Sequence, residues 1–218
     1  MRRVVGIGAG GHAKILVELL QVVGGYTLVG FTDPRPDLMN TRLLGVPILG
    51  DDSLLPGLRC EGVEAAFVGV GATRDVSVRK RLYEIASGLG FEMLTLVHPR
   101  AYVSPSARLG RGTVVLPGAV INTDVTIGDN VTVYSGVIIE HDSVIGDHVH
   151  LSPGVHLAGG VSIGCEAFVG IGASIIQGIR IGASAVIGGG AAVIRDVPSG
   201  TTAVGVPARM LTKTGAEQ

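Results

Sequence analysis

The chain has 218 residues, enough for two small domains, and its formal net charge at pH 7 is −1. A charge this close to zero gives no electrostatic basis for binding nucleic acid or an anionic membrane. The two cysteines, Cys60 and Cys165, lack metal-ligand spacing, and no apolar run reaches the length of a transmembrane helix. The N-terminus has no signal-peptide pattern, so we expect a cytoplasmic protein without membrane insertion or a disulfide framework.

Strands and helices alternate along residues 1–95, which predicts a small α/β domain with a Rossmann-like parallel sheet. The expected strands cover 3–7, 26–31, 46–49, 64–70 and 91–97. One helix is expected to begin near residue 12, and a second helix is expected to cover 75–87. Pro47 would confine the third strand to an edge of the sheet. Ligands of such sheets bind at the carboxyl ends of the strands, which are followed here by loops 8–12, 32–34 and 69–73.

The first of these loops carries a glycine pattern. Residues 6–11 read G-x-G-x-x-G, and Asp33 follows 22 residues after Gly11, which is the dinucleotide fingerprint with an acid placed for a ribose hydroxyl. Glycines let backbone N–H groups at a helix N-terminus approach a pyrophosphate. NAD, a nucleotide-sugar diphosphate and a tight turn without ligand all fit this loop, although a six-stranded dinucleotide fold does not fit before residue 97.

From Val97 onward the chain repeats every six residues. Counting in sixes from Val97 to Val193 gives 17 positions, and each of them is Val, Leu or Ile. Three residues after each lies a turn column, in which 12 of the 17 residues are Gly, Asn or Asp, the types that enter the left-handed backbone region at least cost. Such a period is the signature of a parallel β-helix. We therefore expect a left-handed β-helix of just under six coils over 96–198, followed by a C-terminal loop and tail over 199–218.

One histidine of the repeat stands between two acids. His141 follows Ile139 by two residues and should point outward, flanked by Glu140 and Asp142. Negative neighbours favour imidazolium and would make this histidine a better general base. Asp142 also lies in the turn column, where Asp is a good turn residue in its own right, and His141 taken alone could equally be a surface residue.

Three further histidines lie nearby, at His148, His150 and His156. No two of His141, His150 and His156 are 18 residues apart, so they should not stack on neighbouring coils. His148 falls in the turn column, and Cys165 is not placed beside them. The spacing therefore disfavours a metal site.

Five short motifs mark the chain from its start to its end. They are GAGGHAK at 8–14, VHP at 97–99, EHD at 140–142, LAGGV at 157–161 and GVPAR at 205–209. With these motifs, nearly the whole chain resembles the hexapeptide-repeat sugar acyltransferases of the sialic acid O-acetyltransferase type. Among them it looks most similar to the bacterial nucleotide-sugar N-acetyltransferases. The resemblance implies a homotrimer that binds acetyl-CoA between neighbouring β-helices and needs no metal.

The resemblance also implies roles for the residues that match the family's motifs. His141 would be the general base, and Asp142 would raise its basicity. The acetyl-CoA site would include His150, Ile171 and Gly189, and the nucleotide-sugar site would include Gly10, Gly11, His12 and Asp33.

Counting within the hexad supports part of this assignment. The same outward position, two after the aliphatic residue, is occupied by His141, Gly159, Ile171 and Gly189. Gly159 stands 18 residues after His141 and should lie above it, where a backbone N–H near Gly159 could hold a developing oxyanion at the acetyl-CoA. One position departs from the family, because members often carry Asn seven residues before the catalytic histidine and this chain has Tyr134.

These observations lead us to expect an acetyl-CoA-dependent N-acetyltransferase that acts on the amino group of a nucleotide-linked amino-deoxysugar. The pathway would be bacterial glycan biosynthesis, such as lipopolysaccharide O-antigen, capsule or glycoprotein. The alternatives are a sugar or sialic acid O-acetyltransferase and a non-catalytic nucleotide-sugar-binding protein. The nucleobase and the sugar stay open. Apolar residues in the outward columns would suit a subunit interface, namely Val114, Val120, Ile138, Val144 and Phe168.

Overall fold

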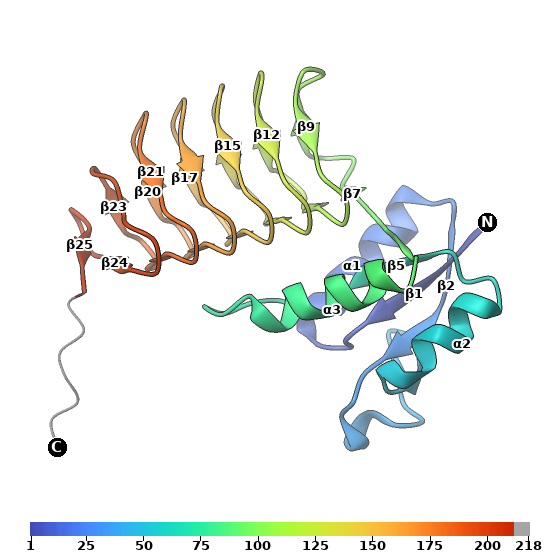
Figure 1. Ribbon diagram of the computed structural model, residues 1–218. Helices are drawn as coiled ribbons and strands as arrows, with labels where there is room; N and C mark the ends of the chain where they lie inside the picture. The colour runs from blue at the N-terminus through green and yellow to red at the C-terminus, as the bar shows by residue number, and fades with distance from the viewer. Residues whose placement is uncertain (212–218) are drawn as a thin grey trace, which may run out of the picture.

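The computed structural model describes residues 1–211 and joins an N-terminal α/β part to a long parallel β-helix (Figure 1). Although a six-stranded fold was not expected to fit before residue 97, the N-terminal sheet has six strands there, because two of them are only two residues long; the order is β3-β4-β2-β1-β5-β6. Its strands are β1 (Arg2–Ile7), β2 (Tyr26–Thr32), β3 (Arg42–Leu43), β4 (Val46–Gly50), β5 (Ala65–Val68) and β6 (Glu92–Met93). All pairs are parallel except β3 with β4. The central strands are apolar and buried on both faces, as a parallel sheet covered by helices requires.

Three helices cover this sheet: α1 (Gly11–Val23), α2 (Leu55–Cys60) and α3 (Ser77–Gly88). The α1 stripe of Ala13, Leu16 and Leu20 packs in one core with Leu96 and Val114 of the β-helix. Helix α1 therefore lies between the sheet and the first coils. Residues of α3, such as Leu82, belong to a separate core on the other face. None of the helices within residues 1–211 could span a bilayer.

The β-helix consists of 17 two-residue strands, β7 to β23, stacked in parallel on three faces. The first face holds β7 (Leu96–Val97), β10 (Val114–Val115), β13 (Thr132–Val133), β16 (His150–Leu151), β19 (Phe168–Val169) and β22 (Val186–Ile187). The second face holds β8 (Tyr102–Val103), β11 (Val120–Ile121), β14 (Ile138–Ile139), β17 (His156–Leu157), β20 (Ser174–Ile175) and β23 (Ala192–Val193). The third face holds β9 (Arg108–Leu109), β12 (Thr126–Ile127), β15 (Val144–Ile145), β18 (Ser162–Ile163) and β21 (Arg180–Ile181).

The predicted hexad phase is confirmed at every position. Each of the 17 strands ends on one of the aliphatic residues counted in sixes from Val97, and these side chains fill the interior of the coils. Two further strands, β24 (Thr202–Val204) and β25 (Arg209–Met210), extend the first face at its C-terminal end. Of the expected C-terminal loop and tail, residues 212–218 lie outside the described residues.

Three sequence expectations were wrong. The strand expected over 91–97 is divided into β6 and β7, because the chain leaves the flat sheet at buried Leu94 to close the first coil. Strand β4, which Pro47 was expected to confine to an edge, is the second strand from the edge, because β3 pairs with its outer side over two residues. Pro47 has no N–H to donate on that side, and the N–H of Ile48 donates to the Thr41 carbonyl instead. Val114, expected at a subunit interface, is 1% exposed because α1 and the N-terminal sheet cover it.

Polar contacts tie α3 to the side of the β-helix. Lys80 Nζ lies 2.8 Å from a carboxylate oxygen of Glu166, and the Tyr83 hydroxyl donates to Asp129 at 2.9 Å. Burial, together with the acceptor Asp129, raises the pKa of Tyr83 to about 12, so this phenol stays a donor at neutral pH. The loop from β5 to α3 is thereby held over the β-helix.

Candidate active site

His141 lies in the turn after β14, and its side chain is 63% exposed, as its outward hexad position predicts. Its Nδ1 lies 2.7 Å from a carboxylate oxygen of Asp142. The hydrogen bond with Asp142 raises the pKa of His141, and the charges of Asp142 and Glu140 act in the same direction. When Nδ1 carries the proton that the carboxylate accepts, Nε2 is left as a free base. Asp142 has a φ of 61°, so it serves both as the turn residue and as the partner of His141.

Gly159 stacks directly on His141, one coil further along. A Cβ atom on Gly159 would lie 2.7 Å from Nε2 and from Cε1 of the imidazole, closer than any real side chain allows. The next residue, Gly160, donates its backbone N–H to the His141 carbonyl at 2.8 Å. Glycine at this position therefore keeps open the space at the nitrogen that would take up a proton.

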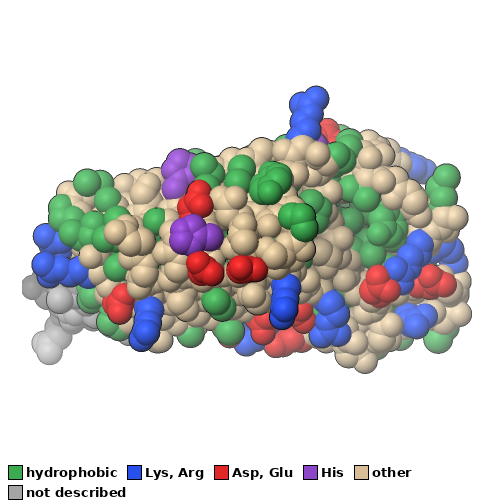
Figure 2. Space-filling model, turned by 90° about the horizontal axis from the view of Figure 1, so that it is seen from above, with side chains coloured by type: hydrophobic (Ala, Val, Ile, Leu, Met, Phe, Trp, Pro, Cys, Tyr) green, Lys and Arg blue, Asp and Glu red, His purple; other side chains and the backbone are tan. Residues whose placement is uncertain are grey.

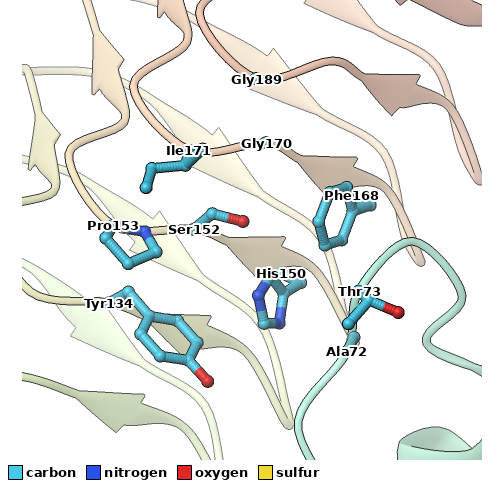
Figure 3. Close-up of a pocket in the computed structure, with 10 residues that line it drawn as sticks. All are labelled: Ala72, Thr73, Tyr134, His150, Ser152, Pro153, Phe168, Gly170, Ile171 and Gly189. Carbon is cyan, nitrogen blue, oxygen red and sulfur yellow. The ribbon is translucent and has the colours of Figure 1, made fainter.

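A cavity of about 410 Å³ lies on a different edge of the β-helix, between the first and second faces (Figure 3). It is lined by Ala72, Thr73, Tyr134, His150, Ser152, Pro153, Phe168, Gly170, Ile171 and Gly189. We call it the edge cavity. Ile171 is 64% exposed, and the Cβ position of Gly189 is 3.1 Å from its side chain, so these two residues stack on adjacent coils. The structure thus brings together Ile171, Gly189 and His150, as the resemblance implies.

His150 points out of the coil but is only 3% exposed. Its ring stacks on Phe168 with a centroid distance of 5.0 Å, and Tyr134 lies 5.0 Å away on another side. Burial, with a smaller effect of Arg79, lowers the pKa of His150 to about 4, so the ring is neutral at pH 7. Its Nδ1 is buried without a hydrogen-bond partner among the described residues.

Tyr134 connects the edge cavity to the N-terminal part. Its hydroxyl lies 2.9 Å from Nδ1 of His12, which is buried at the start of α1. Burial lowers the pKa of His12 to about 3, so this histidine is neutral as well. The Cβ position of Gly71 is 3.5 Å from the Tyr134 hydroxyl. The resemblance implies His12 for the nucleotide-sugar site. In the structure His12 contacts Tyr134 of the β-helix and is not part of the lining of the edge cavity or of the other large cavity within residues 1–211.

A second cavity of about 340 Å³ lies at the carboxyl ends of β1, β2 and β5. Its lining comprises Gly8, Gly10, Asp33, Pro34, Arg35, Asp52, Gly69, Val70, Gly71, Val78, Arg81 and Leu82. We call it the sheet-end cavity. Helix α1 begins beside it at Gly11, with no side chain capping its N-terminus and no acid in its first turn. The free N–H groups of such a helix start favour an anion.

Asp33 is already engaged in this cavity. Its Oδ2 accepts from the Ala9 N–H at 2.8 Å, and the Arg35 guanidinium donates to both of its oxygens at 2.9 Å. Burial alone would raise the pKa of Asp33, but the hydrogen bonds from Arg35 and Ala9 outweigh it and lower the pKa to about 2. Asp52, which sequence reasoning missed, lines the same cavity and accepts from the Thr32 hydroxyl at 2.6 Å. The sequence feature that could have identified Asp52 is its position just after the end of a strand.

The predicted residues are divided between two edges. His141 and Gly159 follow second-face strands β14 and β17, whereas Ile171 and Gly189 follow first-face strands β19 and β22. All four residues share the same position in the hexad, but within one chain the two pairs lie on different edges of the β-helix. Within residues 1–211, no group of three or more His, Cys, Asp or Glu side chains is arranged to hold a metal ion.

Comparisons with known proteins match this architecture. The PglD N-terminal domain family matches residues 3–86, and the bacterial transferase hexapeptide family matches 124–159. A histidine-to-asparagine variant of perosamine N-acetyltransferase from Caulobacter crescentus, solved with CoA and GDP-perosamine, is 42% identical over 98% of both chains, with a TM-score of 0.90. The chain belongs to the family of hexapeptide-repeat nucleotide-sugar N-acetyltransferases.

Two other members of this N-acetyltransferase family show its range. The acetyltransferase domain of PglB from Neisseria gonorrhoeae, in complex with acetyl coenzyme A, is 37% identical, covers 96% of this chain and 99% of its own, and has a TM-score of 0.89. UDP-N-acetylbacillosamine N-acetyltransferase from Bacillus subtilis is 40% identical over 118 residues, which make up 53% of this chain and 51% of that protein. The family and the fold expected from the sequence are thus confirmed.

Proposed function

We propose that this protein transfers the acetyl group of acetyl-CoA to the amino group of a nucleotide-linked amino-deoxysugar, as a step in bacterial glycan biosynthesis. The observation that carries the proposal is the His141–Asp142 pair, with Nδ1 held at 2.7 Å and Nε2 open beneath Gly159. It stands in a chain that matches a perosamine N-acetyltransferase along 98% of its length. The free, exposed thiols of Cys60 and Cys165 fit a reducing compartment, and we place the reaction in the cytoplasm.

The proposed reaction proceeds by direct attack. The diphosphate lies in the sheet-end cavity against Gly10, beside Gly11 at the start of α1, and acetyl-CoA lies along the edge cavity. The amine of the sugar attacks the thioester carbonyl, and Nε2 of His141 takes the proton that the amine loses. A backbone N–H near Gly159 holds the oxyanion of the tetrahedral intermediate. The intermediate then expels CoA as a thiolate, which takes up a proton, and leaves the amide.

This reaction needs His141 beside the edge cavity, and the two lie on different edges of one chain. We therefore propose a homotrimer in which His141 of one protomer faces the edge cavity of the next, with acetyl-CoA between neighbouring β-helices. Exposed apolar side chains support such packing, including Val144 at 51%, Ile171 at 64% and Ile176 at 42%. Figure 2 shows hydrophobic side chains beside histidines and acids on one face of the β-helix.

The first test is CoA thiol release from acetyl-CoA with a panel of GDP-, UDP- and dTDP-linked amino-deoxysugars that carry the amine at carbon 3 or 4. We expect release with at least one of these amino sugars. If no sugar of the panel gives thiol release while the protein is folded and binds acetyl-CoA, the acceptor is not an amine, and a sugar hydroxyl becomes the candidate. If there is no thiol release and no acetyl-CoA binding, the protein is a nucleotide-sugar-binding protein.

Asp142→Asn is expected to move the acidic limb of the kcat/KM–pH profile to lower pH. The base works only when deprotonated, and Asp142 raises the pKa of His141, so removing the carboxylate charge lowers the pH at which the imidazole becomes free. The rate on the alkaline plateau should fall, because a weaker base takes the proton less readily. Glu140→Gln is the matched control, since Glu140 acts on His141 through charge alone and is expected to give a smaller shift of the same sign. An unchanged limb in Asp142→Asn would contradict the assignment.

A further inference from the structure

We propose that Asp52 makes this protein selective for guanine as the nucleobase of its nucleotide sugar. The inference rests on the proposed function in taking the sheet-end cavity as the nucleotide-sugar site. Asp52 belongs to none of the sequence motifs, and its carboxylate would distinguish between the nucleobases that the fold leaves open.

The order of the strands determines where the diphosphate, the ribose and the base of a nucleotide would lie along the edge of the sheet. Strands β1, β2 and β4 are neighbours, and their carboxyl ends carry in turn the Gly8–Gly11 loop, Asp33 and Asp52. Parallel strands lie about 4.8 Å apart, so the end of β4 is roughly 10 Å from the end of β1. With the diphosphate at the start of α1, the ribose falls beyond β2 and the base falls beyond β4. Asp52 then faces the base.

The hydrogen bonds distinguish the two carboxylates of the cavity. Both oxygens of Asp33 accept from the Arg35 guanidinium, and Oδ2 also takes the Ala9 N–H, so Asp33 holds Arg35 and the glycine loop in place. Asp52 accepts one hydrogen bond among the described residues, on Oδ1, from the Thr32 hydroxyl at 2.6 Å. Thr32 is fully buried, so it fixes the orientation of the Asp52 carboxylate while leaving lone pairs for a ligand.

A carboxylate of this kind discriminates between bases by their hydrogen-bonding edges. Guanine presents two adjacent donors, N1–H and the 2-amino group, which a carboxylate accepts together. Uracil and thymine present one N–H between two carbonyl oxygens, and those oxygens repel a carboxylate. A paired contact of this type gives about 5- to 150-fold discrimination between bases. The exposed guanidinium of Arg35, held flat by Asp33, adds a stacking surface for any base.

The test is calorimetric binding of free nucleoside diphosphates to the full chain. We expect the affinity to fall from GDP to IDP, which lacks the 2-amino group, and to fall again from IDP to UDP. Asp52→Asn should abolish the preference for GDP and bind XDP better than GDP, because the Asn amide can donate to the 2-oxo group of xanthine. Asn retains the Oδ1 that accepts from Thr32, so the cavity should keep its shape.

Asp51→Asn is the matched control. Asp51 adjoins Asp52 but only caps the Ser53 N–H, which Asn also does, and it is not part of the cavity lining. It should leave the GDP, IDP and UDP affinities unchanged. Equal binding of GDP and UDP by the unaltered protein would overturn the proposal, and so would an equal loss of every nucleotide in Asp52→Asn, which would indicate a ribose contact. Thiol release with amino sugars is measured in a separate experiment. A protein that prefers GDP but acetylates no amino sugar would refute the proposed function and leave the guanine selectivity standing.

Discussion

Replacing His141 by alanine is expected to lower kcat for acetyl transfer by about 10²–10⁴-fold, the contribution typical of one general base. The exposed imidazole of His141 packs into no core, so its removal should leave the β-helix intact. The residues that line the edge cavity stay unchanged, and His141 takes up a proton rather than holding acetyl-CoA, so the KM for acetyl-CoA should change little. The measurement is steady-state CoA thiol release with the best amino sugar of the panel, alongside a thermal melt of the variant.

His156→Ala is the control for this experiment. His156 is exposed on the second face of the same β-helix and is outside the lining of both large cavities. It should keep the kcat of the unaltered protein. A His141→Ala variant that is folded and as active as His156→Ala would show that another group takes the proton.

The hexad could be predicted at all 17 positions because every coil repeats the same steric problem. One side chain per face must enter a narrow core, and only Val, Leu or Ile fills it, so a slip of one residue would expose the whole column. The turn residues add the same constraint, as Asp124, Asn130 and Asp142 all adopt a positive φ. Repetition of a local rule therefore sufficed to predict the β-helix.

The burial of His150 could not be predicted in the same way. Its hexad position points outward, and a hexad count cannot show that the N-terminal part and Phe168 cover it. The engagement of Asp33 is a similar case, because the fingerprint places an acid after β2 but does not reveal that Arg35 and Ala9 already fill its lone pairs. Both outcomes depend on contacts between segments far apart in the sequence, which local patterns do not encode.

The separation of the site into two edges could have been found by counting coils. His141 and Gly159 are 18 residues apart, as are Ile171 and Gly189, so each pair stacks on one edge. Ile171 stands 30 residues after His141, which is not a multiple of 18, so the two pairs belong to different edges. The same outward position in the hexad is therefore not the same place in space.

A site divided between edges predicts that two inactive variants restore activity when mixed. His141→Ala removes the base, and Gly189→Trp fills the edge cavity, where Gly189 is exposed beside Ile171. In a mixed trimer, a Gly189→Trp protomer supplies an intact His141 to the intact cavity of a His141→Ala neighbour. With equal amounts and random assembly, half of the bases and half of the cavities are intact, so roughly one quarter of the sites should be complete.

The measurement is thiol release after the two variants are unfolded and refolded together, compared with each refolded alone. Activity should rise from the level of either parent to roughly one quarter of that of the unaltered protein. A protomer carrying both substitutions, refolded with His141→Ala, is the control, since no intact His141 is present and activity should stay at the parental level. If His141 and the edge cavity of one chain formed a complete site by themselves, no mixture of the two variants would contain a complete site. Mixing without any gain would therefore reject the shared site, and with it the reason for three-fold assembly.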